Sequence, residues 1–98
     1  MMYSKLHESE HQVVIAICDE GIVGKTFTEG DKELIISEDF YKGILMDEEE
    51  ILDILKGASN VNFAGEDSIS CGLKSGLITE DSIIIIGGVK HAQFFSLE

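Results

Sequence analysis

The sequence predicts a single α+β domain in which a mixed β-sheet of hairpins carries two helices packed on one face. Three observations predict it: β-branched segments open and close the chain, two amphipathic helical segments lie between them, and no linker separates the parts. The 98 residues have the length of one domain, and 44% hydrophobic residues suffice for a core. We therefore expect residues 1–98 to form one domain, although Leu97-Glu98 resembles the remainder of a cloning site.

Two strands are expected at the start of the chain. Residues 3–8 alternate loosely between polar and apolar side chains, which is typical of a short strand. Residues 12–18 are β-branched and apolar, as in a central strand. Residues 9–11 between them predict a tight hairpin turn.

The next part of the chain is less regular. Residues 22–27 and 33–37 predict two further short strands on either side of the turn residues Gly30-Asp31. Residues 38–46 show no clear period, and we expect an irregular segment there with two exposed aromatic side chains, Phe40 and Tyr41.

The first helix is expected over residues 48–56. Asp47 is a good N-cap, Glu50 completes a capping box, and Gly57 ends the helix. Its acidic first turn matches the helix dipole, so the acidic cluster indicates a solvated helix start rather than a metal site. One apolar face is expected to pack on the sheet: Ile51, Leu52, Ile54 and Leu55.

Residues 60–64 predict a strand and residues 66–75 the second helix. Gly72 lies inside this helix, where glycine is unfavourable by about 1 kcal/mol relative to alanine. We therefore expect close packing at Gly72, and Gly76 is expected to end the helix.

The chain closes with a predicted hairpin of residues 82–86 and 89–95 around Gly87-Gly88. Four consecutive isoleucines, residues 83–86, predict a strand buried on both faces. The last strand is expected to form an edge of the sheet ending in Phe94-Phe95. An exposed apolar edge of this kind is often paired with a second copy of the chain, which predicts a homodimer.

The charge of the chain limits its partners. Nineteen carboxylates stand against seven lysines, with no arginine, giving a formal net charge of −12. Because nucleic-acid binding depends on cationic contacts to phosphate, this composition disfavours direct nucleic-acid binding. It favours a basic protein, or a larger cytosolic assembly, as the partner.

The chain shows no signal peptide and no apolar run long enough to span a membrane, so we expect a cytoplasmic protein without a membrane association. Cys18 and Cys71 form no CxxC pair and are expected to be buried thiols. No motif indicates a cofactor.

Two short motifs are present in the wrong context. Residues 7–11, HESEH, match the zinc-protease pattern, but that pattern needs a helix and here a turn is expected. A hairpin would still bring His7 and His11 near each other, which leaves adventitious metal binding open. Gly24-Lys25-Thr26 resembles the end of a phosphate-binding loop, but Asp19 stands where the first glycine is required.

Two other segments are candidates for binding. Residues 62–67 place a glycine between a strand and a helix start, where backbone N–H groups point outward. Glu66 and Asp67 would repel an anion and are expected to cap the helix. His91 lies two residues before Gln93 on one strand face and titrates near neutral pH, but no nucleophile is paired with it by spacing.

Five short motifs resemble a small archaeal family, domain of unknown function 424. The resemblance covers nearly the whole chain, about residues 3–95. The motifs are Ala16-Ile17-Cys18-Asp19, Gly24-Lys25-Thr26-Phe27, Phe40-Tyr41-Lys42-Gly43, Asn62-Phe63-Ala64-Gly65-Glu66 and Gly88-Val89-Lys90-His91-Ala92-Gln93. The resemblance implies a cytosolic α/β protein of this length and implies no established activity, cofactor or substrate. Lys90 stands where the last motif is expected to carry proline.

The resemblance also implies nine candidate binding residues: Asp19, Gly24, Lys25, Tyr41, Asn62, Gly65, Glu66, His91 and Gln93. The favoured hypothesis is a non-enzymatic protein-interaction module without catalytic residues. The alternative is a small-molecule-binding protein or enzyme that uses Asp19, Asn62, Glu66 and His91, which requires these four side chains to meet in one cleft.

Overall fold

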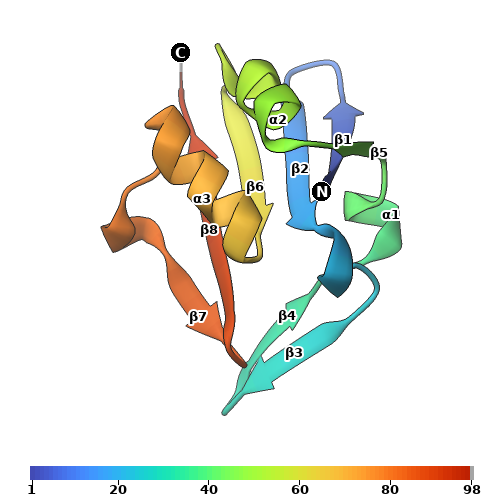
Figure 1. The fold of residues 1–98 in the computed structure, drawn as a ribbon, viewed down its shortest axis with the longest axis vertical. Helices are drawn as coiled ribbons and strands as arrows, with labels where there is room; N and C mark the ends of the chain where they lie inside the picture. Colours follow the sequence, from blue (N-terminus) through green and yellow to red (C-terminus); the bar gives the residue numbers. More distant parts are fainter. Residues whose placement is uncertain (98) are drawn as a thin grey trace.

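Six strands form one mixed sheet with the order β5-β1-β2-β6-β8-β7 in the computed structural model, which describes residues 1–97 (Figure 1). Strands β2 and β6 run parallel, and the other neighbouring strands are antiparallel. The six strands are β1 (Met2–Glu8), β2 (Val13–Asp19), β5 (Ile44–Met46), β6 (Asn60–Ala64), β7 (Ile84–Ile86) and β8 (Val89–Phe95). Glu98, the second residue of the expected cloning-site remainder Leu97-Glu98, lies outside the described residues.

A separate two-stranded hairpin and three α-helices complete the fold. The hairpin consists of β3 (Thr26–Glu29) and β4 (Lys32–Ile35). The helices are α1 (Glu38–Tyr41), α2 (Glu48–Leu55) and α3 (Glu66–Ser75). Two 3₁₀ turns, η1 and η2, lie at Glu20–Ile22 and Glu80–Ser82. No helix among residues 1–97 is long and apolar enough to cross a membrane.

Helices α2 and α3 pack side by side on one face of the sheet, which we call the helix face (Figure 1). Their buried side chains Ile51, Leu55 and Ile69 contact the sheet residues Ile17 and Phe63, and all five are at most 1% exposed. The expected α+β class, with a mixed sheet and two helices on one face, is thereby confirmed.

The opposite face of the sheet carries a second, smaller core that the sequence did not predict. There β4 and α1 cover the ends of β2 and β6, and the cluster contains Ala16, Cys18, Leu34, Ile36, Tyr41, Ala64 and Ile86. The expected irregular segment at residues 38–46 was wrong, because it contains α1 and the edge strand β5. Both elements are too short to show a sequence period.

Tyr41 was also expected to be exposed, but its side chain is only 4% exposed. Ser37 is the N-cap of α1, and its Oγ accepts a hydrogen bond from the Phe40 N–H at 3.2 Å. This single helical turn directs Tyr41 into the second core. The strand expected over residues 22–27 begins only at Thr26, because the chain first makes the 3₁₀ turn that contains Ile22.

The two long helices agree closely with the sequence. In α2 the capping box is formed: Asp47 Oδ1 accepts from the Glu50 N–H at 2.9 Å, and Glu50 Oε1 accepts from the Asp47 N–H at 3.0 Å. Helix α3 has the expected bounds and ends at Gly76 in the left-handed conformation, with φ of 81°. The expected close packing at Gly72 is confirmed, because a Cβ there would lie 2.7 Å from Cδ1 of Ile78.

The C-terminal hairpin is present, but its environment differs from the expectation. Strand β7 is only three residues long and forms an edge of the sheet, with Ile84 48% and Ile85 54% exposed. The predicted burial on both faces was therefore wrong. Strand β8 lies inside the sheet order rather than at its edge, although β7 covers only its first half, Val89–His91.

Candidate functional site

Asp19 forms the most elaborate polar contact among the candidate residues. At the end of β2, its carboxylate accepts hydrogen bonds from the N–H groups of Asp67 (3.0 Å) and Ser68 (2.8 Å) and from Ser68 Oγ (2.9 Å). These donors lie in the first turn of α3, whose own N-cap residue, Gly65, has no side chain to accept them. Asp19 therefore caps a helix that begins almost fifty residues further along the chain.

Gly65 makes this contact possible. Its backbone has φ of 104° and ψ of 164°, a conformation that is essentially restricted to glycine. A Cβ at this position would lie 2.4 Å from Cγ of Asp19 and 2.7 Å from both carboxylate oxygens. The motif residues Asp19 and Gly65 are thus brought together as two halves of one helix cap.

Glu66 and Asp67 do not cap α3 through their side chains, contrary to the expectation. Glu66 instead forms an ion pair with Lys90, at 3.1 Å between Oε1 and Nζ. The side-chain cap of α3 comes from Asp19, which no local sequence pattern identifies as a cap, whereas Glu66 and Asp67 add negative charge in the first turn.

Asn62, His91 and Gln93 form a second group on the face opposite the helices. Asn62 on β6 pairs directly with Gln93 on β8, and His91 pairs with Ala64 on the same strand. Because residues two apart in a strand share a face, the three side chains lie in adjacent rows of this face. Asn62 and His91 are half-buried, and Gln93 is exposed.

Of the remaining candidates, Gly24 and Lys25 lie at the base of the β3–β4 hairpin and Tyr41 lies in the second core. The Gly24 N–H donates to the Ile36 carbonyl and Lys25 is exposed, whereas Tyr41 is buried. Burial raises the pKa of the Tyr41 hydroxyl to about 12, with a further contribution from Cys18. The nine candidate residues are therefore distributed over three places: the α3 cap, the opposite sheet face and the hairpin base.

The four residues of the enzyme alternative do not share a cleft. Asp19 and Glu66 contact α3 and Lys90 on the helix face, whereas Asn62 and His91 lie on the opposite face. None of the four lines the pockets described beside α1, α2 and the N-terminus. The buried thiol of Cys18 is a poor nucleophile near pH 7, because burial, together with the Asp19 charge, raises its pKa to about 12.

His91 has one property that can be measured directly. Burial lowers its pKa below the ordinary value of 6.5, because the charged imidazolium is poorly solvated there. The unfolded chain therefore takes up this proton at higher pH than the folded chain. The stabilising contribution is complete above pH 6.5 and is lost as the pH falls through the lowered pKa.

We expect H91Q to flatten this pH dependence. Urea unfolding of the wild type and the variant at a series of pH values should give free energies whose difference changes between pH 7 and pH 5. The comparison removes the contributions of carboxylates and of the other histidines, which both proteins share. A difference that stays constant with pH would contradict the assignment to His91.

The two discounted motifs lie where the sequence analysis expected. The HESEH segment spans the end of β1 and its turn rather than a helix; His7 Nε2 lies 2.8 Å from the Phe40 carbonyl, and His11 is exposed beside Glu10. Within residues 1–97, no group of three or more His, Cys, Asp or Glu side chains could hold a metal ion. Gly24-Lys25-Thr26 leads into strand β3, not into a helix.

Two buried polar residues were not predicted from the sequence. Ser68 is fully buried and donates to Asp19, and Asn60 is 8% exposed with its Oδ1 atom unpaired among the described residues. The alternation in Asn60-Val61-Asn62 was a usable signal, because it places both amides on the face opposite the apolar side chains. Nothing local distinguishes Ser68 from other helix serines.

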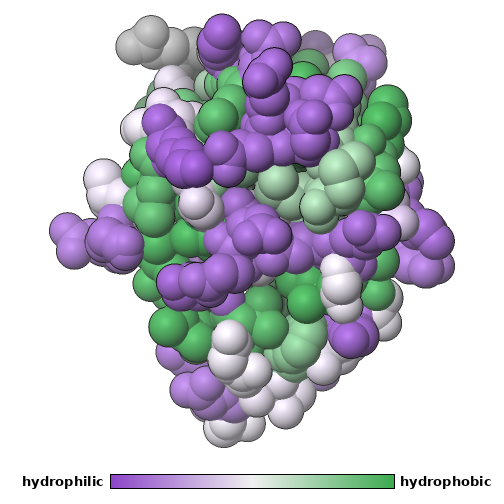
Figure 2. All heavy atoms as spheres, viewed as in Figure 1, coloured by the Kyte–Doolittle hydropathy of each residue, from purple (hydrophilic) through white to green (hydrophobic). Residues whose placement is uncertain are grey.

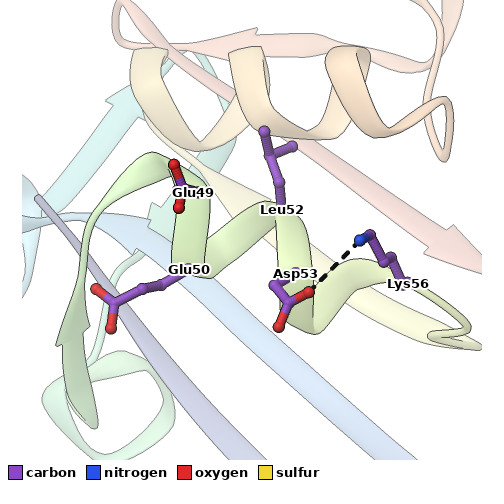
Figure 3. A pocket seen from close by; sticks show the side chains of 5 residues that line it. All are labelled: Glu49, Glu50, Leu52, Asp53 and Lys56. Carbon is purple, nitrogen blue, oxygen red and sulfur yellow. Dashed lines mark ion pairs between the residues drawn. The ribbon is translucent and has the colours of Figure 1, made fainter.

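A surface rich in carboxylates covers the outer side of the two helices, and we call it the acidic helix surface. Figure 2 shows a broad hydrophilic patch over the position of α2. Around an open pocket of about 500 Å³, α2 presents Glu49, Glu50 and Asp53, and Asp53 pairs with Lys56 at 3.5 Å (Figure 3). The residues of this surface are Glu48, Glu49, Glu50, Asp53, Glu66 and Asp67.

The first turns of α2 and α3 belong to one continuous part of this surface. Glu48 and Asp67 line the same pocket, of about 280 Å³, together with Asp47. Lys74 bridges the helices by donating to both carboxylate oxygens of Glu48 at 3.0 Å. Glu49 and Asp67, in contrast, have no cation paired with their side chains among the described residues.

These features define a small α+β domain. Four of its candidate residues lie outside the pockets described above: Asp19 caps a helix, and Asn62, His91 and Gln93 lie on one sheet face. The chain belongs to the family described as Protein of unknown function (DUF424), whose model matches residues 7–97. The expected family is therefore confirmed.

A solved structure supports the same fold. The chain is similar to an uncharacterized conserved protein from Methanopyrus kandleri, an archaeon, with 28% sequence identity and a TM-score of 0.78. The match covers 99% of this chain and 95% of that protein. No curated protein matches the chain.

Proposed function

We propose that the protein is a non-enzymatic interaction module that binds a basic protein surface through the acidic helix surface. The observation that carries this proposal is the density of carboxylates on α2. Between Asp47 and Leu55, five of nine residues are acidic and none is basic. Helix capping accounts for Asp47 and Glu50, but Glu49 and Asp53 point outward without any capping role.

The pairing of the lysines also favours a basic partner over nucleic acid. Four of the seven lysines each form an ion pair with a carboxylate: Lys42, Lys56, Lys74 and Lys90. Such pairing reduces the positive potential available to a phosphate backbone, so nucleic acid is a poor candidate partner. A basic protein would meet the net charge of −12 with favourable long-range attraction.

The proposal includes a cytoplasmic location. Cys18 and Cys71 are both buried and free in the described part of the chain. Free thiols are typical of a reducing compartment, where disulfides rarely persist.

The decisive experiment compares two variants of equal net charge. The double variant E49K and D53K replaces two of the six carboxylates of the acidic helix surface by lysine, whereas D31K and E33K make the same charge change on the exposed β3–β4 hairpin. Affinity capture from an extract of the source organism at low salt should recover a basic protein with the wild type and the hairpin variant, and at least about tenfold less with the helix variant.

Two results would refute the proposal. Equal recovery with both variants would show that the partner recognises charge without recognising this surface. If the wild type recovers no basic protein, the proposed function is wrong. Thermal unfolding of each variant ensures that the comparison uses folded protein.

A further inference from the structure

The outer side of the second half of β8 is an unpaired sheet edge. Strand β7 pairs with Val89–His91 only, because its register ends at Ile84 opposite His91. On its other side, β8 pairs with β6 from His91 to Phe95. Among the described residues, Ala92–Phe95 therefore have a neighbouring strand on one side alone.

The hydrogen-bond pattern identifies which backbone groups face outward. The Gly65 N–H donates to the Lys90 carbonyl at 2.9 Å, and the Ser96 N–H donates to the Ser59 carbonyl at 2.8 Å. The backbone groups of successive residues point to alternate sides of an antiparallel strand. The N–H and C=O groups of Ala92 and Phe94 therefore also point toward β6. The N–H and C=O groups of Gln93 and Phe95 consequently point away from β6, beyond the end of β7.

This edge lacks the devices that normally protect an exposed strand. Residues 91–97 contain no lysine, carboxylate or proline, and Lys90 is the one charged residue in the whole segment 82–97. Apolar side chains beside the edge are exposed: Phe95 is 56% and Ile84 is 48% exposed. Figure 2 shows hydrophobic residues along the flank where β7 lies.

We propose that a second copy of this chain occupies the edge, with β8 of one copy pairing antiparallel to β8 of the other. A two-fold axis at Phe94 would let Gln93 exchange two hydrogen bonds with Phe95 of the partner subunit, and symmetry would repeat this pair. Four backbone hydrogen bonds then satisfy the outward groups of both copies. Phe94, half-buried on the helix face, would lie opposite Phe94 of the partner subunit.

Charge favours a second copy over a basic protein at this place. A two-fold interface brings identical surfaces together, so two chains of net charge −12 associate most easily where each is uncharged. Segment 91–97 is such a place, and it offers no carboxylate to a basic partner. The acidic helix surface, in contrast, repels itself.

The dimer joins two six-stranded sheets into one continuous sheet. Because the two-fold axis is perpendicular to the sheet, α2 and α3 of both copies lie on the same face. The inference stands independently of the proposed function; where both hold, the dimer presents two acidic helix surfaces on one side and strengthens binding to a partner with two basic sites.

The first test uses the wild-type protein over a range of concentrations. Light scattering should give a mass of twice 10.8 kDa at high concentration. Backbone amide hydrogen exchange should show that Gln93 and Phe95 become protected on dimerisation, whereas Ala92 and Phe94 are protected in monomer and dimer alike. A monomer at every concentration, or a dimer in which Gln93 and Phe95 still exchange rapidly, overturns the proposal.

Salt separates this association from binding to a basic partner. Because two acidic chains repel each other, added salt should lower the dimer dissociation constant, whereas it should weaken binding to a basic protein. A dimer that dissociates as salt increases contradicts the uncharged edge as its interface. This opposite response also makes failure of the dimer distinguishable from failure of the proposed function.

The second test uses Q93P with Q93A as the matched control. Proline removes an N–H that points outward, so the ladder to β6 remains while the edge is blocked. We expect Q93P to raise the dimer dissociation constant at least about tenfold and Q93A to leave it nearly unchanged. A folded Q93P that dimerises like the wild type overturns the proposal. If Q93P does not unfold cooperatively, and so is not properly folded, F95K replaces it in the test. F95K removes the exposed ring beside the edge and should likewise raise the dimer dissociation constant at least about tenfold.

Discussion

Replacing Gly65 with alanine should lower the free energy of unfolding by about 4 kcal/mol. The backbone of Gly65 has φ of 104° and ψ of 164°, and holding another residue in that region costs about 1–3 kcal/mol. The added Cβ would also lie 2.4 Å from Cγ of Asp19, so the carboxylate must move and the cap of α3 is lost. Loss of a cap contributes about 1 kcal/mol more.

Urea unfolding followed by circular dichroism measures this effect. G57A is a suitable control, because Gly57 also has positive φ, 75°, but a Cβ there meets nothing within 4 Å. It should therefore show backbone strain without the clash. If G65A and G57A destabilise the protein equally, the contact between Gly65 and Asp19 is not important for stability.

Replacing Asp19 with alanine should lower the free energy of unfolding by about 3 kcal/mol. The substitution removes three hydrogen bonds to the first turn of α3, and a lost helix cap accounts for about 1 kcal/mol. The larger part comes from Ser68, which is fully buried, since a buried donor left without a partner costs about 1–3 kcal/mol.

D19N is the informative control for this substitution. Asparagine keeps an acceptor oxygen near the α3 N-terminus but removes the negative charge, so we expect a loss smaller than that of D19A. The measurement is again urea unfolding, with the amide exchange of Ser68 as a local probe. A D19A protein as stable as the wild type would mean that the cap contributes nothing.

The double variant G65A and D19A tests whether these two residues act as one unit. Once the carboxylate is removed, the alanine Cβ at position 65 no longer collides with it. The loss of the double variant should therefore be smaller than the sum of the single losses by about 1–2 kcal/mol. Additive losses would show that the two motif residues stabilise the fold separately.

The structure brings together only some of the candidate binding residues. The motifs containing Asp19 and Gly65 were both selected, but as members of one binding face, whereas the structure uses them to begin α3. His91, Asn62 and Gln93 do come together, because strand alternation and register place them on one face. Tyr41 lies on the same face, in the second core with Ala16 and Ala64, but it is buried. Lys25 is exposed at the base of the β3–β4 hairpin.

Local patterns determined most of the fold. The capping box of Asp47 and Glu50, the stop at Gly76 and the turn at Gly87-Gly88 depend on neighbouring residues alone, and each was predicted where the structure has it. The short elements α1 and β5 were missed, because three or four residues carry no period.

The sequence by itself determined the two long helices, the hairpins and the strong negative charge, because capping, periodicity and composition are properties of a chain segment. Only the tertiary structure decided that Asp19 caps α3, that Tyr41 is buried and that β8 is left half-covered. Each of these depends on contacts between segments distant in sequence, and the energy of such contacts has no counterpart in any local pattern.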